Sequence, residues 1–418
     1  MLSTLTNALK VPDIRKRLLY TFLMLLVFRL GAHIPVPGIN VKVIEDLVNN
    51  GQLLGFFDVI SGGAFKNFTI FAMSITPYIT TSIIMQLLTI VIPSLERLAK
   101  EGEEGRKKIA QYTRFGTVIL SFIQAVGLTF GLRGAVINPS FINLTIIALT
   151  LTSGTAFLMW LGEQITDKGI GNGTSLIIFA GILSRIPSMI YTGFQYVKVG
   201  TASFFGAIFF IVAVIVMIVG VVIMNEGQRR IPIQYAKRVI GRRVYGGQST
   251  HIPIRVNQAG VIPIIFALSV VGFPLQLAAF FPHTAYAAFI NKWLNTGSFM
   301  YNFFNAILII FFTYFYTAIT FNPIEIADNI KKYGGFIPGI RPGRPTSDYL
   351  MRIMNRVTLA GALFLALITV LPVILMKVTG LQIYFGGTSI LIAVGVALET
   401  MKQIEAQLLM RQYQGFLK

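Results

Sequence analysis

Residues 204–224 read FFGAIFFIVAVIVMIVGVVIM, an uninterrupted apolar run without one charged side chain. A helix that crosses a bilayer needs ~20 mostly apolar residues. Lipid offers the backbone no hydrogen-bond partner, so only a helix or a closed barrel satisfies its own peptide groups there. Barrel strands alternate polar and apolar residues, whereas this run is continuously apolar. The stretch therefore predicts a transmembrane helix.

Nine other segments have the same apolar character, and the first and last of them are the shortest. The ten predicted spans cover about residues 18–32, 68–92, 115–132, 141–162, 174–192, 204–224, 256–280, 300–321, 357–376 and 386–398. The sequence thus predicts an all-α polytopic membrane protein with ten transmembrane helices. Ten divides into five plus five, and two halves of five that share a fold must face opposite ways, as in inverted-repeat membrane proteins.

The composition excludes other protein classes. The chain has 418 residues, of which 54% are hydrophobic types and 12% are charged types. An average soluble protein carries roughly 25% charged residues, and a soluble surface of this size needs that charge. A disordered chain needs low hydrophobicity. A membrane protein with many spans is therefore the expected class.

The charge is strongly asymmetric, with 35 Lys and Arg against 16 Asp and Glu. In a membrane protein such an excess indicates topology and contact with anionic lipid. Ten spans place both termini on one side, and most of the Lys and Arg residues fall on that side. The positive-inside rule then makes both termini cytoplasmic. It also makes the two longest loops, residues 225–255 and 322–355, basic and cytoplasmic.

Motifs for catalysis or metal binding are missing from the sequence. There is no Cys, and His33, His251 and His283 are isolated, as ordinary loop or interface histidines are. No phosphate-binding loop, paired carboxylates or Ser-His arrangement occurs. The Gly-rich residues 169–174 fit a loop and a helix N-cap better than a nucleotide site. We therefore expect no enzyme, no cofactor and no metal, and energy for any transport supplied by a partner.

Two stretches stay ambiguous on physical grounds alone. Residues 55–65, GFFDVISGGAF, are apolar but too short to cross the bilayer, so they either line a cavity or lie flat among the lipid headgroups. Ile75, Ile79 and Gln86 share roughly one face of a helix, beside the break at Thr76-Pro77. On this pattern alone, lipid-facing isoleucines next to a proline kink are the better interpretation.

At this point the sequence resembles the SecY family of protein-translocation channels over essentially its whole length. The motifs that carry the resemblance are FRLG (28–31), IPVPG (34–38), SGGA (61–64), PYI (77–79), IMQLL (84–88), KEGE (100–103), QYTR (111–114), WLGEQIT (160–166), GIGNG (169–173), GQRRI (227–231), YAKR (235–238), QSTH (248–251), AGVIP (259–263), FIPGIRPG (336–343) and YFGGTS (384–389). Departures are modest: the loop at residues 133–139 and the C-terminal tail are short.

The resemblance implies a clamshell of two pseudo-symmetric inverted halves, residues 1–195 and 196–418, around an hourglass pore. A short plug helix at about residues 55–66 would close the pore, and its predicted residues are Phe57, Asp58, Val59, Ile60, Ser61, Gly62, Gly63, Ala64 and Phe65. The family's pore ring aligns with Ile75, Ile79, Ile178, Ile265 and Ile392. Branched apolar side chains that meet at a narrow point repel water and ions, while a polypeptide can still slide through.

The resemblance also implies a gate that opens sideways between the second and seventh spans and releases apolar segments into lipid. A weakly polar seam would serve this purpose, and we place Thr80, Thr81, Gln86, Asn257 and Gln258 there. For both threonines, hydroxyls bonded back to their own helix are an equally good interpretation.

The basic loops would dock the ribosome or the motor ATPase SecA, through Arg229, Arg230, Lys237, Arg238, Arg242, Arg243 and Arg341. Further implied partners are SecE and SecG in a heterotrimer, the preprotein with its signal peptide, and anionic lipids of the cytoplasmic membrane. A passive protein-conducting channel is the preferred interpretation. The alternative is an ion-coupled secondary transporter of small solutes, which the charge-free span interiors and the large basic loops disfavour.

Overall fold

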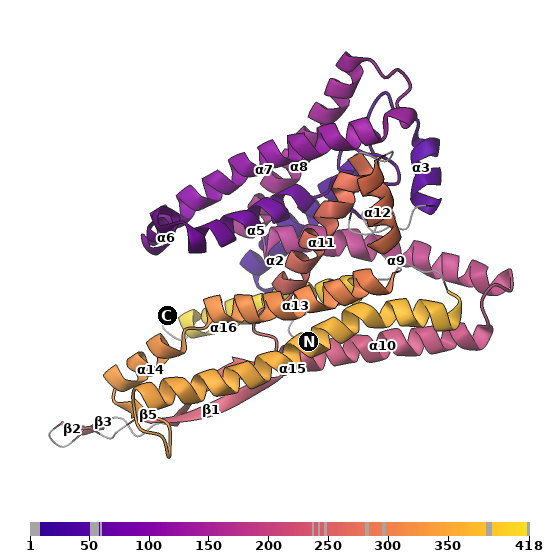
Figure 1. Cartoon of the computed structure of the whole chain (residues 1–418). Coiled ribbons are helices and arrows are strands. Elements are labelled where there is room, and N and C mark those ends of the chain that lie inside the picture. Colours follow the sequence, from indigo (N-terminus) through magenta and orange to yellow (C-terminus); the bar gives the residue numbers. More distant parts are fainter. Residues whose placement is uncertain are drawn as a thin grey trace.

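A helix occupies each of the ten regions predicted to span the membrane (Figure 1). The computed structural model describes residues 9–50, 58, 61–235, 238–240, 243–245, 249–280, 284–294, 298–381 and 387–415. The ten long helices are α2 (Pro12–Gly31), α5 (Thr76–Val91), α7 (Glu103–Gly131), α8 (Phe141–Lys168), α9 (Gly173–Lys198), α10 (Phe204–Glu226), α11 (Ile262–Phe280), α13 (Phe299–Thr320), α15 (Arg344–Thr379) and α16 (Gly387–Gly415).

Six of these helices are each long and apolar enough to cross a membrane: α7, α8, α9, α10, α13 and α15. Helix α5 meets that standard only together with α6 (Pro93–Lys100), from which it is bent by 100°. The apolar part of α11 that the structure describes is shorter, at Ile262–Leu275. Helices α2 and α16 carry charged residues along part of their length. Hydropathy alone therefore does not identify α2, α5, α11 and α16 as spanning helices.

The second predicted span, residues 68–92, is wrong in its first third. Residues 61–75 form a series of turns, and the helix begins only at Thr76. Proline is favoured in the first turn of a helix because its missing N–H has no partner there, and Pro77 stands at that position. The apolar Phe68 and Phe71 are buried inside the protein rather than facing lipid. Irregular backbone at membrane depth requires such burial.

Other helices extend beyond their predicted ends. Helix α16 continues from the predicted end at residue 398 to Gly415, and α15 begins at Arg344, inside the region predicted as a loop. Hydropathy detects only the apolar part of such a helix, so its polar turns are missed. The shorter elements are α3 (Val41–Asn50), η1 (Arg133–Ala135), α12 (Ala285–Trp293) and α14 (Pro323–Lys332).

The two basic loops fold together into a small sheet. Strand β1 (Gln228–Tyr235) pairs antiparallel with β4 (Ser249–Arg255) on one side and with β5 (Gly335–Phe336) on the other. The short strands β2 (Arg238–Ile240) and β3 (Arg243–Tyr245) pair with each other. Ile231 and Ile254 of the sheet share a buried cluster with Leu350 of α15. The loops are therefore one folded unit, which hydropathy did not predict.

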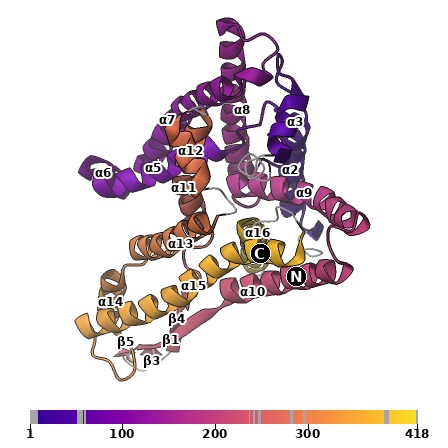
Figure 2. The same cartoon turned by 45° about the vertical axis from the view of Figure 1, so that its right-hand side comes forward.

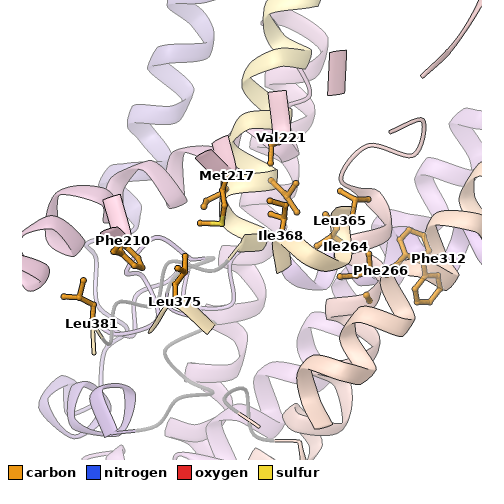
Figure 3. Close-up of a cluster of buried hydrophobic side chains, with 14 of the residues drawn as sticks. Phe210, Met217, Val221, Ile264, Phe266, Phe312, Leu365, Ile368, Leu375 and Leu381 are labelled. Atoms are coloured by element: carbon orange, nitrogen blue, oxygen red, sulfur yellow. The ribbon is translucent and has the colours of Figure 1, made fainter. Parts of the chain in front are cut away.

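The buried core follows the order of the chain only in part. One large cluster joins α10, α11, α13, α15 and α16 with Ile83 of α5, and ten of its side chains are labelled in Figure 3. Two other clusters join α2, α7, α8 and α9 with the turns before α5, and one of them includes Ile392 and Val396 of α16. Figures 1 and 2 both show α5, α6, α7 and α8 gathered on one side and α10, α13, α14 and α15 on the other. Helix α11 reaches from the second group to contact α5 and α7 of the first.

Candidate functional site

The five isoleucines predicted as a pore ring come from four helices and lie where the two helix groups meet. Ile75 caps α5 and Ile79 lies one turn further along, while α9, α11 and α16 contribute one residue each. Ile75, Ile178 and Ile392 belong to one buried cluster. Ile79 packs against this cluster and also against the cluster of the second group, against which Ile265 packs as well. All five isoleucines therefore belong to or pack against these two clusters, which Ile79 joins.

A cavity of about 530 Å³ opens beside this constriction. Ile178, Ile265 and Ile392 form part of its apolar wall. Polar side chains from α9, α10, α16 and the stretch before α11 line other parts of it: Asn172, Ser175, Asn225, Arg255, Asn257, Gln258, Glu399, Lys402 and Gln403. We call this space the central cavity. An apolar point beside a polar space can exclude water at the narrow place while the cavity itself stays wet.

The Gly-rich turn between α8 and α9 is a loop and an N-cap, as predicted. The side chain of Asn172 accepts a hydrogen bond from the backbone N–H of Ser175 at 3.2 Å, which caps α9. Gln403 of α16 accepts a bond from the N–H of Gly171 at 2.9 Å. This turn therefore places Ile178 beside α16 and links the two helix groups next to the central cavity.

Six of the nine predicted plug residues lie in the described part of the chain, whereas Phe57, Val59 and Ile60 lie outside it. Asp58, Ser61 and Ala64 are fully buried. Ala64 belongs to the same cluster as Ile75 and Ile178, so this segment lies directly against the predicted ring. Phe65 and Phe68 instead join the cluster around α8. Of the two interpretations of residues 55–65, the described residues favour the one buried inside the protein.

Charged side chains hold this segment from two helices. A guanidinium nitrogen of Arg185 on α9 lies 2.6 Å from a carboxylate oxygen of Asp58. Arg29 of α2 donates a hydrogen bond to the carbonyl of Gly62 at 2.8 Å. The sequence analysis assigned neither arginine to the site, because the local sequence does not show which distant residues an arginine contacts.

The predicted gate residues are not gathered into one cluster. The hydroxyls of Thr80 and Thr81 donate to the carbonyls of Thr76 and Pro77, at 3.1 and 2.9 Å, within their own helix. The back-bonded interpretation of both threonines is therefore the one that the structure shows. A Cβ on Gly116 of α7 would meet the methyl group of Thr81, so this threonine faces α7 rather than α11.

The other three predicted gate residues lie nearer the seam. Asn257 donates from Nδ2 to Oδ1 of Asn225 at 2.8 Å, and both it and Gln258 line the central cavity. Gln86 shares a hydrogen bond with Tyr316 of α13, which joins α5 of the first helix group to the second. Tyr316 is a residue that sequence reasoning missed, and it also lines the central cavity.

The basic residues lie on the folded unit of the two loops. Arg229 and Arg230 are exposed on β1, and Arg341 is exposed between β5 and α15. Arg238 and Arg243 lie on β2 and β3, while Lys237 and Arg242 lie outside the described residues. Pairing of β1 with β5 holds the first loop against the second. The structure therefore gives one basic surface, made from both loops.

Within the residues that the structure describes, no three His, Asp or Glu side chains gather into a group able to hold a metal ion. His33 shares a hydrogen bond with the carbonyl of Arg29 at 2.8 Å. Lys66, next to the plug segment, forms an ion pair with Glu45 at 2.9 Å. The hydrogen bond within this pair lowers the pKa of Glu45.

Comparison with known proteins matches these features to one family. The SecY family model matches residues 69–401. A protein translocase subunit SecY of Halalkalibacterium halodurans is 50% identical over 436 residues, covering 100% of both chains. Relatives with this name support the preferred interpretation from the sequence, and none of these findings supports the small-solute transporter.

Solved structures share the fold. The chain in "The structure of a protein conducting channel" superposes with a TM-score of 0.66 at 18% identity, covering 94% of this chain and 92% of that one. Sec61 in the canine ribosome-channel complex superposes with a TM-score of 0.62 at 18% identity and the same coverage. The ten-helix clamshell predicted from the sequence is thus confirmed as the fold. With the family model and a full-length relative in agreement, this multi-pass membrane protein belongs to the SecY family.

Proposed function

We propose that this chain is the pore-forming subunit of a protein translocase, which conducts unfolded preproteins across the membrane. The observation that carries the proposal is that five isoleucines from four helices belong to or pack against two adjoining clusters, and that three of them line the central cavity. In this proposal the two halves, residues 1–195 and 196–418, meet there, although α9 continues past this boundary to Lys198. An apolar ring at such a seam would hold back ions without making sequence-selective contacts with a passing polypeptide.

The plug and the side exit follow from the same geometry. Asp58, Ser61, Ala64 and Phe65 are buried, and Ala64 shares a cluster with Ile75 and Ile178, which supports a plug that closes the pore. Helix α11 contacts α5 and α7 across the seam. Parting of these helices would open a path from the pore into lipid for apolar segments and signal peptides. The few polar contacts across that path, such as the one between Gln86 and Tyr316, are weak enough to be broken and reformed.

The chain itself is a passive channel and not an enzyme, so its partners supply the energy. The basic surface with Arg229, Arg230 and Arg341 suits the phosphates of ribosomal RNA or an acidic face of the SecA motor. The relative in a ribosome-channel complex supports the ribosome as one partner. By the positive-inside rule, this surface and both termini are cytoplasmic in the cell membrane. SecE-like and SecG-like subunits and anionic lipids complete the assembly.

Transport by a reconstituted complex tests the proposal. The chain would be co-expressed with SecE-like and SecG-like subunits, purified, and placed in vesicles with a SecA motor, ATP and a radiolabelled preprotein. We expect ATP-dependent protection of the preprotein from external protease, and none without the motor. A complex that binds its partners but protects no preprotein, in vesicles where an established translocase succeeds, would refute the proposal.

A further inference from the structure

Asp58 is a carboxylate in an unusual place, because its side chain is fully buried. An ionised carboxylate removed from water is costly unless it is paired and hydrogen-bonded. Here one carboxylate oxygen lies 2.6 Å from the guanidinium of Arg185. The other accepts a hydrogen bond from the backbone N–H of Lys66 at 2.7 Å. One oxygen therefore has an ion-pair partner on a transmembrane helix but no hydrogen bond, and the other has a backbone hydrogen bond.

A second contact lies four residues further along the same segment. The carbonyl of Gly62 accepts a hydrogen bond from Arg29 of α2 at 2.8 Å, and the hydroxyl of Ser184 lies 3.4 Å from the same oxygen. Gly62 has φ +67°, and a Cβ there would lie 2.7 Å from the Cα of Gly181 on α9. The segment is thus seated closely on α9 and held by one arginine at each of two points.

Both holding helices belong to the first half of the chain. The ion pair of Asp58 and the side-chain bonds to Gly62 come from α2 and α9, and the lysine after them pairs with Glu45 of α3. Moving the second half away from the first would leave these contacts unbroken. Release of the segment therefore requires its own step, in which a buried ion pair is separated.

We propose that Arg185 and Arg29 form a two-point latch that fixes the plug segment through Asp58 and Gly62. This inference rests on the proposed channel function. Removing one partner of a buried ion pair leaves an uncompensated charge and is strongly destabilising, whereas replacing both partners is often nearly neutral. The Asp58–Arg185 pair therefore sets how often the resting channel loses its plug, and Arg185 acts as a positioning residue.

A single cysteine reports directly on the latch, because the chain has no cysteine of its own. Ala64 is fully buried in the plug segment, so Ala64→Cys supplies a reporter thiol. The reporter complex is placed in vesicles without a motor, and the rate of labelling by a water-soluble maleimide is measured. We expect Asp58→Asn and Arg185→Gln each to raise that rate about tenfold, since the first leaves the half-buried guanidinium of Arg185 without its partner and the second leaves the buried carboxylate of Asp58 without its partner.

Two further variants separate a latch from a general loss of structure. The double variant Asp58→Asn with Arg185→Gln leaves no unpaired charge, so we expect it to label several-fold more slowly than either single variant. Lys100→Gln is the matched control. It removes an exposed pair with Glu96 on α6, so its labelling rate should equal that of the reporter parent.

The ion conductance of the same vesicles gives a second measurement that does not need the thiol. It should rise in the two single variants and return toward the parent in the double variant. Single variants with parental labelling and conductance overturn the latch, and so does a double variant as open as the single ones. Preprotein transport by the parent is measured in parallel. A parent that transports while the variants stay closed refutes the latch alone, whereas a parent that transports nothing refutes the proposed function.

Discussion

Ile265 lies half-buried on the seam, where it lines the central cavity and packs against the core of the second helix group. A polar side chain at this point gives water a hydrogen-bond partner in the constriction and so lowers the barrier to ions. We expect Ile265→Asn to raise the ion leak of the resting channel several-fold and to allow export of preproteins with defective signal sequences. Both are measurable, by vesicle conductance and by export assays.

Ile265→Val is the matched control for this prediction. Valine keeps a branched apolar surface, and loss of one buried methylene costs about 1 kcal/mol, so the seal should hold. Unchanged leak and unchanged signal stringency in Ile265→Asn would remove this residue from the ring.

Gly62 tests how closely the plug segment must fit α9. Its positive φ and its contact with Gly181 both disfavour a side chain. A non-glycine residue forced into such a conformation costs about 1–3 kcal/mol. We therefore expect Gly62→Ala to raise the labelling rate of the Ala64→Cys reporter about tenfold. Gly134→Ala in η1, where a Cβ meets nothing within 4 Å, should leave it unchanged. Equal rates in the two variants would show that the close fit is unimportant.

Part of this residue-scale picture could be predicted from the sequence. The spacing of Ile75 and Ile79 on one helix face is visible in the sequence, although by itself it favoured a lipid-facing position. All five isoleucines became ring candidates only through the family resemblance, because residues on separate helices have no common local pattern. The pairing of Asp58 with Arg185 could not be predicted for the same reason, since the two residues are far apart in the chain. Contacts of this kind depend on packing, which periodicity does not report.

At the scale of elements, hydropathy predicted the existence of the ten long helices but not their ends. It merged the turns at residues 68–75 with the helix α5, because buried turns are as apolar as a span. It predicted α15 and α16 to be shorter than they are, because the polar turns of both helices extend beyond the apolar part. It also missed β1 and β4, whose isoleucines stand only at alternate positions, and β5, which has two residues.

Helices α5 and α13 supply a prediction about the gate. Tyr316 of α13 shares a hydrogen bond with Gln86 of α5 across the seam. A hydrogen bond contributes about 0.5–1.5 kcal/mol net. Tyr316→Phe should therefore raise the equilibrium constant for parting of α5 from α13 by about 2- to 10-fold. We expect a marginally apolar test segment to partition into lipid more often, as measured by its membrane-integrated fraction.

Tyr314→Phe is the matched control, because Tyr314 donates to the carbonyl of Asn355 at 3.2 Å, within the second helix group. Its loss should not affect the seam. Equal partitioning of the test segment in both tyrosine variants would contradict a role for Tyr316 in closing the gate.

At the scale of the whole molecule, the proposed plug and the proposed docking surface belong to different halves. The plug segment is fixed to α2 and α9, whereas the basic sheet is built on α15 of the second group. Force applied at the sheet therefore acts on the second half and reaches the plug only across the seam. Such a division lets a partner open the seam first and leaves the plug to be displaced by the passing chain.

Arg341 tests whether the basic sheet is the surface on which the motor acts. It is exposed, and its carbonyl accepts a hydrogen bond from the hydroxyl of Thr346 at 2.9 Å, which shapes the backbone of the loop without using the guanidinium. Arg341→Glu reverses one charge in the docking surface and leaves that backbone bond intact. We expect SecA-driven export to be lost, while membrane insertion and assembly with the small subunits continue.

Arg344→Glu is the matched control, since Arg344 is also exposed and carries the same charge three residues away, at the start of α15. If a general excess of positive charge drives docking, both variants should weaken export equally. A position-specific contact predicts loss only at Arg341, and normal export by Arg341→Glu would exclude this loop as the motor's contact.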